Sequence, residues 1–183
     1  MTEDKDQGKA PPEQHTVPPR TFSCGKYKFV GDENIEALFK SPLDPWYVTG
    51  FCEGESSFTY NTSSGRITLI FAVKLTKSDA ALVYRIYNFF KVGRLYPVKR
   101  LNPRGNSGFT KSATYYRVNK INDLEVIVEH FDKFPLQGEK QKKYKIWKEM
   151  AILKTQFRNC DEERIALLAK KLSSLSPKNL PWE

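Results

Sequence analysis

The chain has 183 residues and a net charge of +9, which is long enough for one domain with a hydrophobic core. No apolar run is long enough to cross a membrane, and neither a secretory signal nor a clear mitochondrial presequence is visible. Cys24, Cys52 and Cys160 are widely spaced and odd in number, which argues against a disulfide framework or a zinc site and favours a reducing intracellular compartment.

The amino-terminal segment differs in composition from the rest. Residues 1–20 are rich in Pro, Lys, Glu and Gln, so we expect them to be disordered when alone. Residues 21–43 are ambiguous, with a short strand at 27–30 and a helical turn at 34–39 as candidates. The expected organisation is a flexible extension at 1–43, a single domain at 44–176 and a tail at 177–183.

The domain is predicted to open with a helix from about Pro45 to Glu53. Asp44 is a suitable N-cap, and proline is favoured at the first helical position. The apolar face that we expect on this helix carries Trp46, Val48 or Thr49, Gly50 and Phe51. Gly50 lacks a side chain, which would let another backbone approach closely.

A β-hairpin is predicted next, because residues 57–61 and 66–74 alternate around the turn at 63–65. The inner face of the hairpin is expected to carry Phe58, Tyr60, Ile67, Leu69, Phe71 and Val73. The outer face is expected to carry Ser57, Thr59, Asn61, Arg66, Thr68, Ile70, Ala72 and Lys74.

Helical spacing then predicts a helix from Ser78, a plausible cap, to Phe90, with Gly93 ending it. Strands are expected at 94–100, where Pro97 favours an edge position, and at 113–118. Further helices are predicted from Asn122 to Phe131, from Lys140 to Lys154 with Tyr144, Trp147, Ile152 and Leu153 inward, and over 161–174. The order is helix, hairpin, helix, hairpin, helix, helix.

Two carboxylates, Glu53 and Glu55, stand at the end of the first helix of the domain. The carboxyl end of a helix is already negative, so this placement is unfavourable unless a cation is bound nearby. Hard divalent cations take oxygen ligands, which makes a metal site one interpretation. A surface helix that happens to end in acidic residues is the other.

The segment from Trp46 to Phe58 resembles the LAGLIDADG motif of homing endonucleases and intron maturases, in its fungal and organellar branch. The resemblance extends over about residues 44–155 and implies an α+β fold of order αββαββα, with an antiparallel, saddle-shaped sheet that sits on DNA. Family members need two motifs, and this chain has one. The resemblance therefore implies a homodimer whose interface includes Trp46, Thr49, Gly50 and Glu53.

By position in the motif, Glu55 would be the catalytic residue and the Mg²⁺ ligand, and Glu53 would be mostly structural. The segment 134–140 resembles the family's Pro-Leu turn and lysine, which makes Lys140 a candidate for polarising the phosphate. Lys140 could equally be one of several lysines on a basic helix. Two departures from the family are Ser56, where Gly is usual, and Leu75, where a polar residue is frequent.

The basic balance also suggests a nucleic-acid partner, because residues 45–183 hold 24 basic and 13 acidic residues, a net of +11. Alternate side chains of a sheet can read base edges in the major groove, and lysines can hold phosphates. The predicted contact residues are Ser57, Thr59, Asn61, Arg66, Thr68, Lys74, Arg94, Tyr96, Lys99, Arg100, Arg104, Tyr115 and Arg117.

The leading hypothesis is therefore a Mg²⁺-dependent, site-specific double-strand DNA endonuclease. As a homodimer it would cut a near-palindromic site across the minor groove, and its branch of the family suggests an organelle, most simply the mitochondrion. The alternative is a noncatalytic protein that binds structured RNA, as a maturase or as a subunit of a ribonucleoprotein such as an organellar ribosome. A third hypothesis is one half of a heteromeric enzyme.

Overall fold

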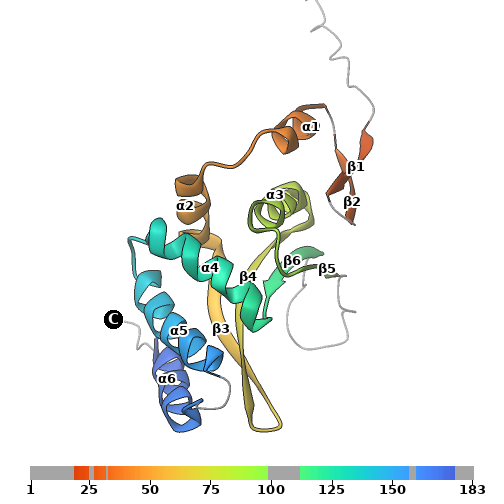
Figure 1. Ribbon diagram of the computed structural model, residues 1–183. Coiled ribbons are helices and arrows are strands. Elements are labelled where there is room, and N and C mark those ends of the chain that lie inside the picture. The colour runs from red at the N-terminus through yellow and green to blue at the C-terminus, as the bar shows by residue number, and fades with distance from the viewer. Residues whose placement is uncertain (1–18, 25–26, 32, 99–111, 157–159, 176–183) are drawn as a thin grey trace, which may run out of the picture.

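The computed structural model describes residues 19–24, 27–31, 33–98, 112–156 and 160–175. Its elements are β1 (Arg20–Cys24), β2 (Tyr27–Gly31), α1 (Glu33–Lys40), α2 (Pro45–Glu55), β3 (Ser56–Ser63), β4 (Arg66–Thr76), the 3-10 turn η1 (Lys77–Asp79), α3 (Ala80–Phe90), β5 (Arg94–Val98), β6 (Ala113–Val118), α4 (Ile121–Lys133), α5 (Lys140–Thr155) and α6 (Glu162–Ser174). The order from α2 to α4 is αββαββα, which confirms the predicted α+β class (Figure 1).

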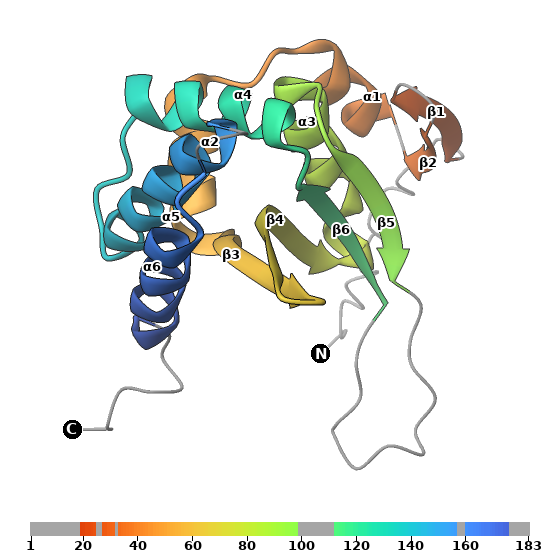
Figure 2. The ribbon, with the colours of Figure 1, turned by 60° about the horizontal axis from the view of Figure 1, so that its bottom comes forward.

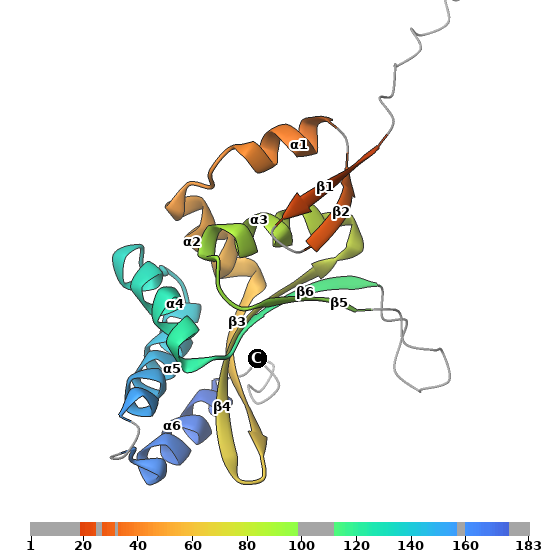
Figure 3. The same cartoon turned by 45° about the vertical axis from the view of Figure 1, so that its right-hand side comes forward.

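The main sheet has four antiparallel strands in the order β3-β4-β6-β5. Helices α2, α3 and α4 lie on one side of it (Figure 2). The sheet twists strongly, so that the β3–β4 hairpin and the β5–β6 pair run in different directions (Figure 3). The edge strand β3 is flanked by α5 and α6, which follow the core helices in the chain.

The motif helix α2 begins as the sequence predicts. Oδ1 of Asp44 accepts hydrogen bonds from the backbone N–H groups of Trp46 at 2.8 Å and Tyr47 at 3.1 Å, and Pro45 is the first helical residue. The helix continues two residues further than expected, to Glu55. Its buried side chains are Val48, Thr49 and Cys52, whereas Trp46 is 50% exposed and Gly50 is exposed, so the apolar face expected from the sequence is corrected.

The predicted hairpin is confirmed, and its turn uses Ser64 and Gly65 in the left-handed region, at φ 49° and 74°. Its outer face differs from the expectation at two positions. Ile70 and Ala72 are each only 2% exposed, so the middle of β4 is buried on both faces. The polar outer face therefore has an apolar interruption at its centre.

Three local expectations were wrong. Helix α3 ends at Phe90, and Lys91 provides the left-handed C-cap at φ 58°, so Gly93 does not end the helix. Gly93 has φ +80°, and a Cβ there would lie 2.6 Å from the carbonyl oxygen of Arg117, which explains the glycine. Ser78 makes no cap bond to the helix, and Ile152 is 48% exposed instead of inward.

The described part of the segment that was expected to be a flexible extension forms the antiparallel pair β1–β2 and helix α1. Both lie near α3, on the same side of the sheet (Figures 1 and 3). Nη2 of Arg85 on α3 donates to the carbonyl oxygen of Ser41 at 3.4 Å. Among the described helices, none combines the length and apolar character that a bilayer span requires.

Aromatic rings form the centre of the core. Phe58 of β3 packs against Phe71, Phe131, Tyr144 and Trp147, with ring centroids 5.2 to 5.3 Å apart. These rings come from β3, β4, α4 and α5, so one side chain joins the sheet to two helices. Nε1 of Trp147 also donates to the carbonyl oxygen of Thr59 at 3.1 Å, which satisfies a backbone group on the edge strand.

We predict that Phe58→Ala lowers the free energy of unfolding by ~3–5 kcal/mol, because it removes a fully packed aromatic ring and leaves a cavity. The matched control is Leu167→Ala, since Leu167 of α6 is 58% exposed and its truncation should cost no more than ~0.5 kcal/mol. Urea denaturation followed by tryptophan fluorescence measures both. Equal losses in the two variants would contradict this description of the core.

Candidate functional site

The carboxyl end of α2 is held by a lysine from another helix. Nζ of Lys140, the first residue of α5, donates to the carbonyl oxygens of Cys52 at 2.9 Å, Gly54 at 3.1 Å and Ser56 at 2.7 Å. An ammonium group has three N–H donors, so all of them are used. Lys140 therefore caps the orphan carbonyls of α2, and its positive charge offsets the negative end of the helix dipole.

Ser56 completes this cap. Its hydroxyl is buried and donates to the carbonyl oxygen of Cys52 at 2.6 Å, and its backbone N–H is directed to the same oxygen. The departure from the usual glycine is thus absorbed by a local hydrogen bond. Cys52 is a core residue, because burial raises the pKa of its thiol to about 12 and keeps it protonated.

Glu53 faces the loop between α4 and α5. Its Oε2 accepts from the backbone N–H of Gln137 at 2.9 Å, and a Cβ on Gly138 would lie 3.0 Å from its Oε1. The half-buried carboxylate therefore fixes the loop that delivers Lys140. Burial lowers the pKa of Lys140, and the charges of Glu53 and Glu55 oppose this shift.

Glu55 is exposed and accepts no hydrogen bond from the described residues. It lies close enough to Lys140 for its charge to act on that ammonium group. Its two oxygens suit a hard cation. Within the described residues, no three His, Cys, Asp or Glu side chains come together as a metal cluster.

Thr49 lies on the inner side of α2, which corrects its assignment to a dimer interface. It is 3% exposed, and its Oγ1 donates to the carbonyl oxygen of Phe134 at 2.9 Å. Since that uses the hydroxyl proton, Nε2 of His130, 3.1 Å away, must donate to Thr49. Burial lowers the pKa of His130 to about 4, so the ring is neutral near pH 7.

The outer side of α2 is open. Cβ atoms added at Gly50 and Gly54 would meet no atom of the described residues within 4 Å. Trp46 is half exposed, and its ring lies edge-on to Phe134 with centroids 5.3 Å apart. Of the four residues predicted for a dimer interface, Trp46 and Gly50 therefore face outward, whereas Thr49 and Glu53 are engaged within the chain.

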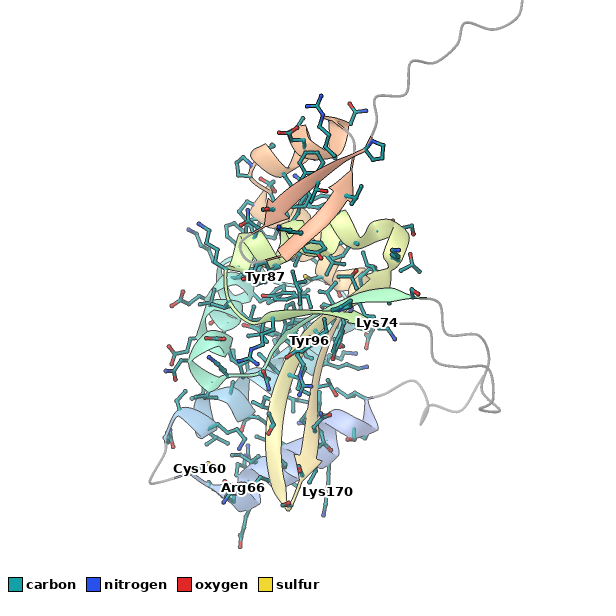
Figure 4. The ribbon with its side chains drawn as sticks, turned by 90° about the vertical axis from the view of Figure 1, so that its right-hand side faces the viewer. Arg66, Lys74, Tyr87, Tyr96, Cys160 and Lys170 are labelled. Atoms are coloured by element: carbon teal, nitrogen blue, oxygen red, sulfur yellow. The ribbon has the colours of Figure 1, made fainter. Side chains whose placement is uncertain are left out.

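The outer face of the sheet carries most of the predicted nucleic-acid contacts. Strand register places Lys74, Tyr115 and Tyr96 in one row across β4, β6 and β5, and the two tyrosine rings are 6.3 Å apart. Figure 4 shows Lys74 and Tyr96 near each other in the sheet and Arg66 at the hairpin tip. The exposed contact residues are Ser57, Thr59, Asn61, Arg66, Lys74, Arg94 and Tyr96, and the partly exposed ones are Thr68, Tyr115 and Arg117.

The electrostatics of this face are one-sided, because its four strands contain no Asp or Glu. Arg94 and Arg117 are directly paired on β5 and β6, an arrangement of like charges that an anion would relieve. Nε of Arg117 is buried and has no hydrogen-bond acceptor among the described residues. The predicted residues Lys99, Arg100 and Arg104 lie outside the described residues.

Sequence reasoning did not find the capping role of Lys140 or the contact between Thr49 and His130. These partners are 84 to 88 and 81 residues apart in the chain. Periodicity could place each residue on a helix but could not show which helices touch. Leu75, the second departure from the motif, is half-buried and packs against the core.

The sequence model of the LAGLIDADG endonuclease family matches residues 48–151, and the chain belongs to this family. An uncharacterized 50.9 kDa protein in ND4 intron 1 of Podospora anserina is 30% identical over 122 residues, which are 62% of this chain and 25% of that protein. Probable intron-encoded endonuclease 2 of Neurospora crassa is 26% identical over 145 residues, 79% of this chain and 30% of that protein. The chain thus spans less than a third of these relatives.

Solved structures agree with the fold. The LAGLIDADG meganuclease I-AabMI, bound to uncleaved DNA, is 26% identical with a TM-score of 0.56, covering 73% of this chain and 43% of that one. I-SmaMI, bound to cleaved DNA, is 25% identical with a TM-score of 0.57, covering 77% and 50%. The homing endonuclease I-TnaI, at 22% identity and a TM-score of 0.58, shares the fold over 76% of this chain and 100% of its own.

Because His130 is neutral in the folded protein, we predict that lowering the pH destabilises the fold. The pKa of His130 is lowered from 6.5 to about 4 in the folded protein. The stability that this residue contributes is therefore present above pH 6.5 and is lost as the pH falls towards 4. From pH 7 to pH 5 the free energy of unfolding should drop by about 2 kcal/mol through this residue. Urea titrations at both pH values measure the drop.

The control is His130→Gln, whose amide can still donate to Thr49 but does not titrate. The difference between the two proteins isolates the histidine from carboxylates that titrate in the same range. If the free energy of unfolding depends on pH in the same way in both proteins, the assignment of His130 as a buried neutral residue is wrong.

Proposed function

We propose that this chain is a Mg²⁺-dependent, site-specific DNA endonuclease that works with two LAGLIDADG motifs brought together, in the simplest case as a homodimer. The observation that carries the proposal is the exposed carboxylate of Glu55 at a helix end fixed by Lys140. Metal-dependent hydrolysis of a phosphodiester requires a charged ligand that is already in position before the metal binds.

In this proposal Glu55 would hold the ion. Bound there, a divalent ion would lower the pKa of a water molecule and neutralise charge on the phosphate. Hydrolysis adds water across one P–O bond of the backbone. Lys140 acts as a positioning residue, because its ammonium group is fully engaged with the helix that aims Glu55. Glu53 holds the loop that precedes Lys140.

The second motif would supply what one copy lacks. One Glu55 is a single ligand, and the open side of α2 at Gly50 and Gly54 offers a surface for close approach of a second helix. A homodimer would have two-fold symmetry, so its target would be near-palindromic. The same face would equally accept a second repeat on another chain, as in a heteromeric enzyme.

DNA is favoured as the partner because structures similar to this chain are DNA complexes, and because the outer strands carry Arg and Lys without any acid. No observation specifically favours the noncatalytic RNA role. The two departures from the family, Ser56 and Leu75, fit into the helix cap and the core. The intron-encoded fungal relatives support a proposed organellar, mitochondrial location.

We predict that Glu55→Gln reduces cleavage by roughly three orders of magnitude, as expected for loss of a dominant electrostatic group, while folding and DNA binding are retained. A plasmid library with randomised inserts, incubated with Mg²⁺ and sequenced at the cut ends, measures cleavage for the native protein and the variant. The control is Glu129→Gln, an exposed carboxylate on α4. Full cleavage by the Glu55 variant would show that the site is elsewhere.

We also predict that Gly50→Leu separates folding from association. In the part of the chain that the structure describes, no atom lies within 4 Å of a Cβ at this position, so the single chain should fold normally. Leucine is also the better helix former. Light scattering should give twice the 21.2 kDa chain mass for the native protein and the monomer mass for the variant. Gly50→Ala should give an intermediate dimer affinity. A native monomer would favour a partner other than a second copy.

A further inference from the structure

A small polar hollow lies beside the candidate site, between the edge strand β3 and helices α5 and α6. It has a volume of about 190 Å³, and its polar lining includes Ser56, Ser57, Thr59, Lys140 and Lys143. Ser56 directly follows Glu55 in the chain, so the lining of the hollow starts at the residue next to the candidate metal ligand. The hydrophobic wall is formed by residues such as Phe58 and Leu172.

Lys143 is the available cation of this hollow. Lys140 has used its three donors on backbone carbonyls, and Lys142 pairs with Glu139 at 2.8 Å. Lys143, one helical turn after Lys140, makes no hydrogen bond or ion pair with the described residues. It is only partly exposed, so its charge is less screened by solvent than that of a fully exposed lysine.

The hollow is built for an anion and not for a cation. None of the described residues that line it carries a carboxylate, whereas a larger hollow of about 720 Å³ nearby is lined by Glu53 and Glu139. Lys140 and Lys143 line both hollows, and the charge of Lys143 is close enough to lower the pKa of Lys140, although burial lowers it more. An anion between them would relieve this repulsion.

The amino end of α5 adds to the preference. This helix has 16 residues, its first turn contains no acidic side chain, and the side chain of its N-cap residue, Glu139, makes no capping hydrogen bond. The positive end of its dipole therefore lies at Lys140 and Lys143, and favours negative charge in the same place.

We propose that this hollow binds a backbone phosphate of the nucleic acid adjacent to the phosphate that is cut, with Lys143 as its charged ligand and the hydroxyls of Ser57 and Thr59 as further donors. A phosphodiester has only acceptor oxygens, which matches a lining of donors. This inference rests on the proposed function and deepens it. The two lysines then have different roles: Lys140 positions Glu55, and Lys143 contacts the substrate.

Lysine acetylation followed by mass spectrometry tests these two roles. The full chain is treated with and without a short DNA duplex of mixed sequence at low salt. Without DNA, Lys140 should react slowly and Lys143 quickly. With DNA, Lys143 should be protected several-fold. Lys145 is the matched control, because it is exposed on the same helix and lines neither hollow.

Lys74 on the outer strand face reports on the proposed function separately. Protection of Lys74 without protection of Lys143 would overturn the phosphate site and leave DNA binding by the sheet intact. Protection of neither lysine would overturn DNA binding and the phosphate site together.

Salt dependence gives a second readout. Lys143→Gln should reduce the slope of log K against log salt by about 0.9 for the same duplex, as expected for loss of one phosphate contact. Lys145→Gln should leave the slope unchanged, and Lys143→Arg should restore it. An unchanged slope in Lys143→Gln would contradict the proposed contact.

Discussion

The three hydrogen bonds from the ammonium group of Lys140 to the end of α2 are the interaction on which the arrangement of the site depends. Two carboxylates at the negative end of a helix repel that end and each other, and an unsatisfied carbonyl there is costly when partly buried. One cation from α5 answers both problems. The same helix packs into the core through Tyr144 and Trp147, so the position of Lys140 is fixed by the packing of the core.

That arrangement also explains why Glu53 and Glu55 have different surroundings although they are one residue apart. Glu53 is turned towards the loop that leads into α5 and accepts from Gln137, which ties the position of Lys140 to the motif helix. Glu55 is turned to solvent with its oxygens unused by the described residues. One carboxylate thus stabilises the fold, and the other is available for chemistry.

Much of the fold could be predicted from local patterns because local physics determines it. Alternation gave the two faces of the β3–β4 hairpin, and Asp44 with Pro45 gave the start of α2. The failures were of another kind. Ile70 and Ala72 obey the alternation but are buried by tertiary packing, and Ile152 obeys the helical period but lies outside the contact between α5 and its neighbours. Only the assembled chain decides these cases.

For the candidate site, the sequence supplied candidate residues but not their contacts. The resemblance to the motif made Glu55 and Lys140 candidates. Nothing in the sequence indicated that Lys140 would donate all its hydrogen bonds to the end of α2, or that Lys143 would have no hydrogen-bond or ion-pair partner among the described residues. Basic helices are common, and spacing alone assigns the same role to every lysine on them. The distinction arises from which carbonyls and carboxylates the other helices bring within reach.

The two sides of helix α2 have different surroundings. Its inner side is committed to the chain through Val48, Cys52 and the bond from Thr49 to Phe134, while its outer side at Gly50 is bare. Thr49 and Gly50 are neighbours, so a change in the rotation of the helix about its axis would expose one set and bury the other. The neutral His130, which donates to Thr49, opposes such a rotation and so keeps the bare side directed outward. The open face and the buried histidine are therefore two parts of one constraint.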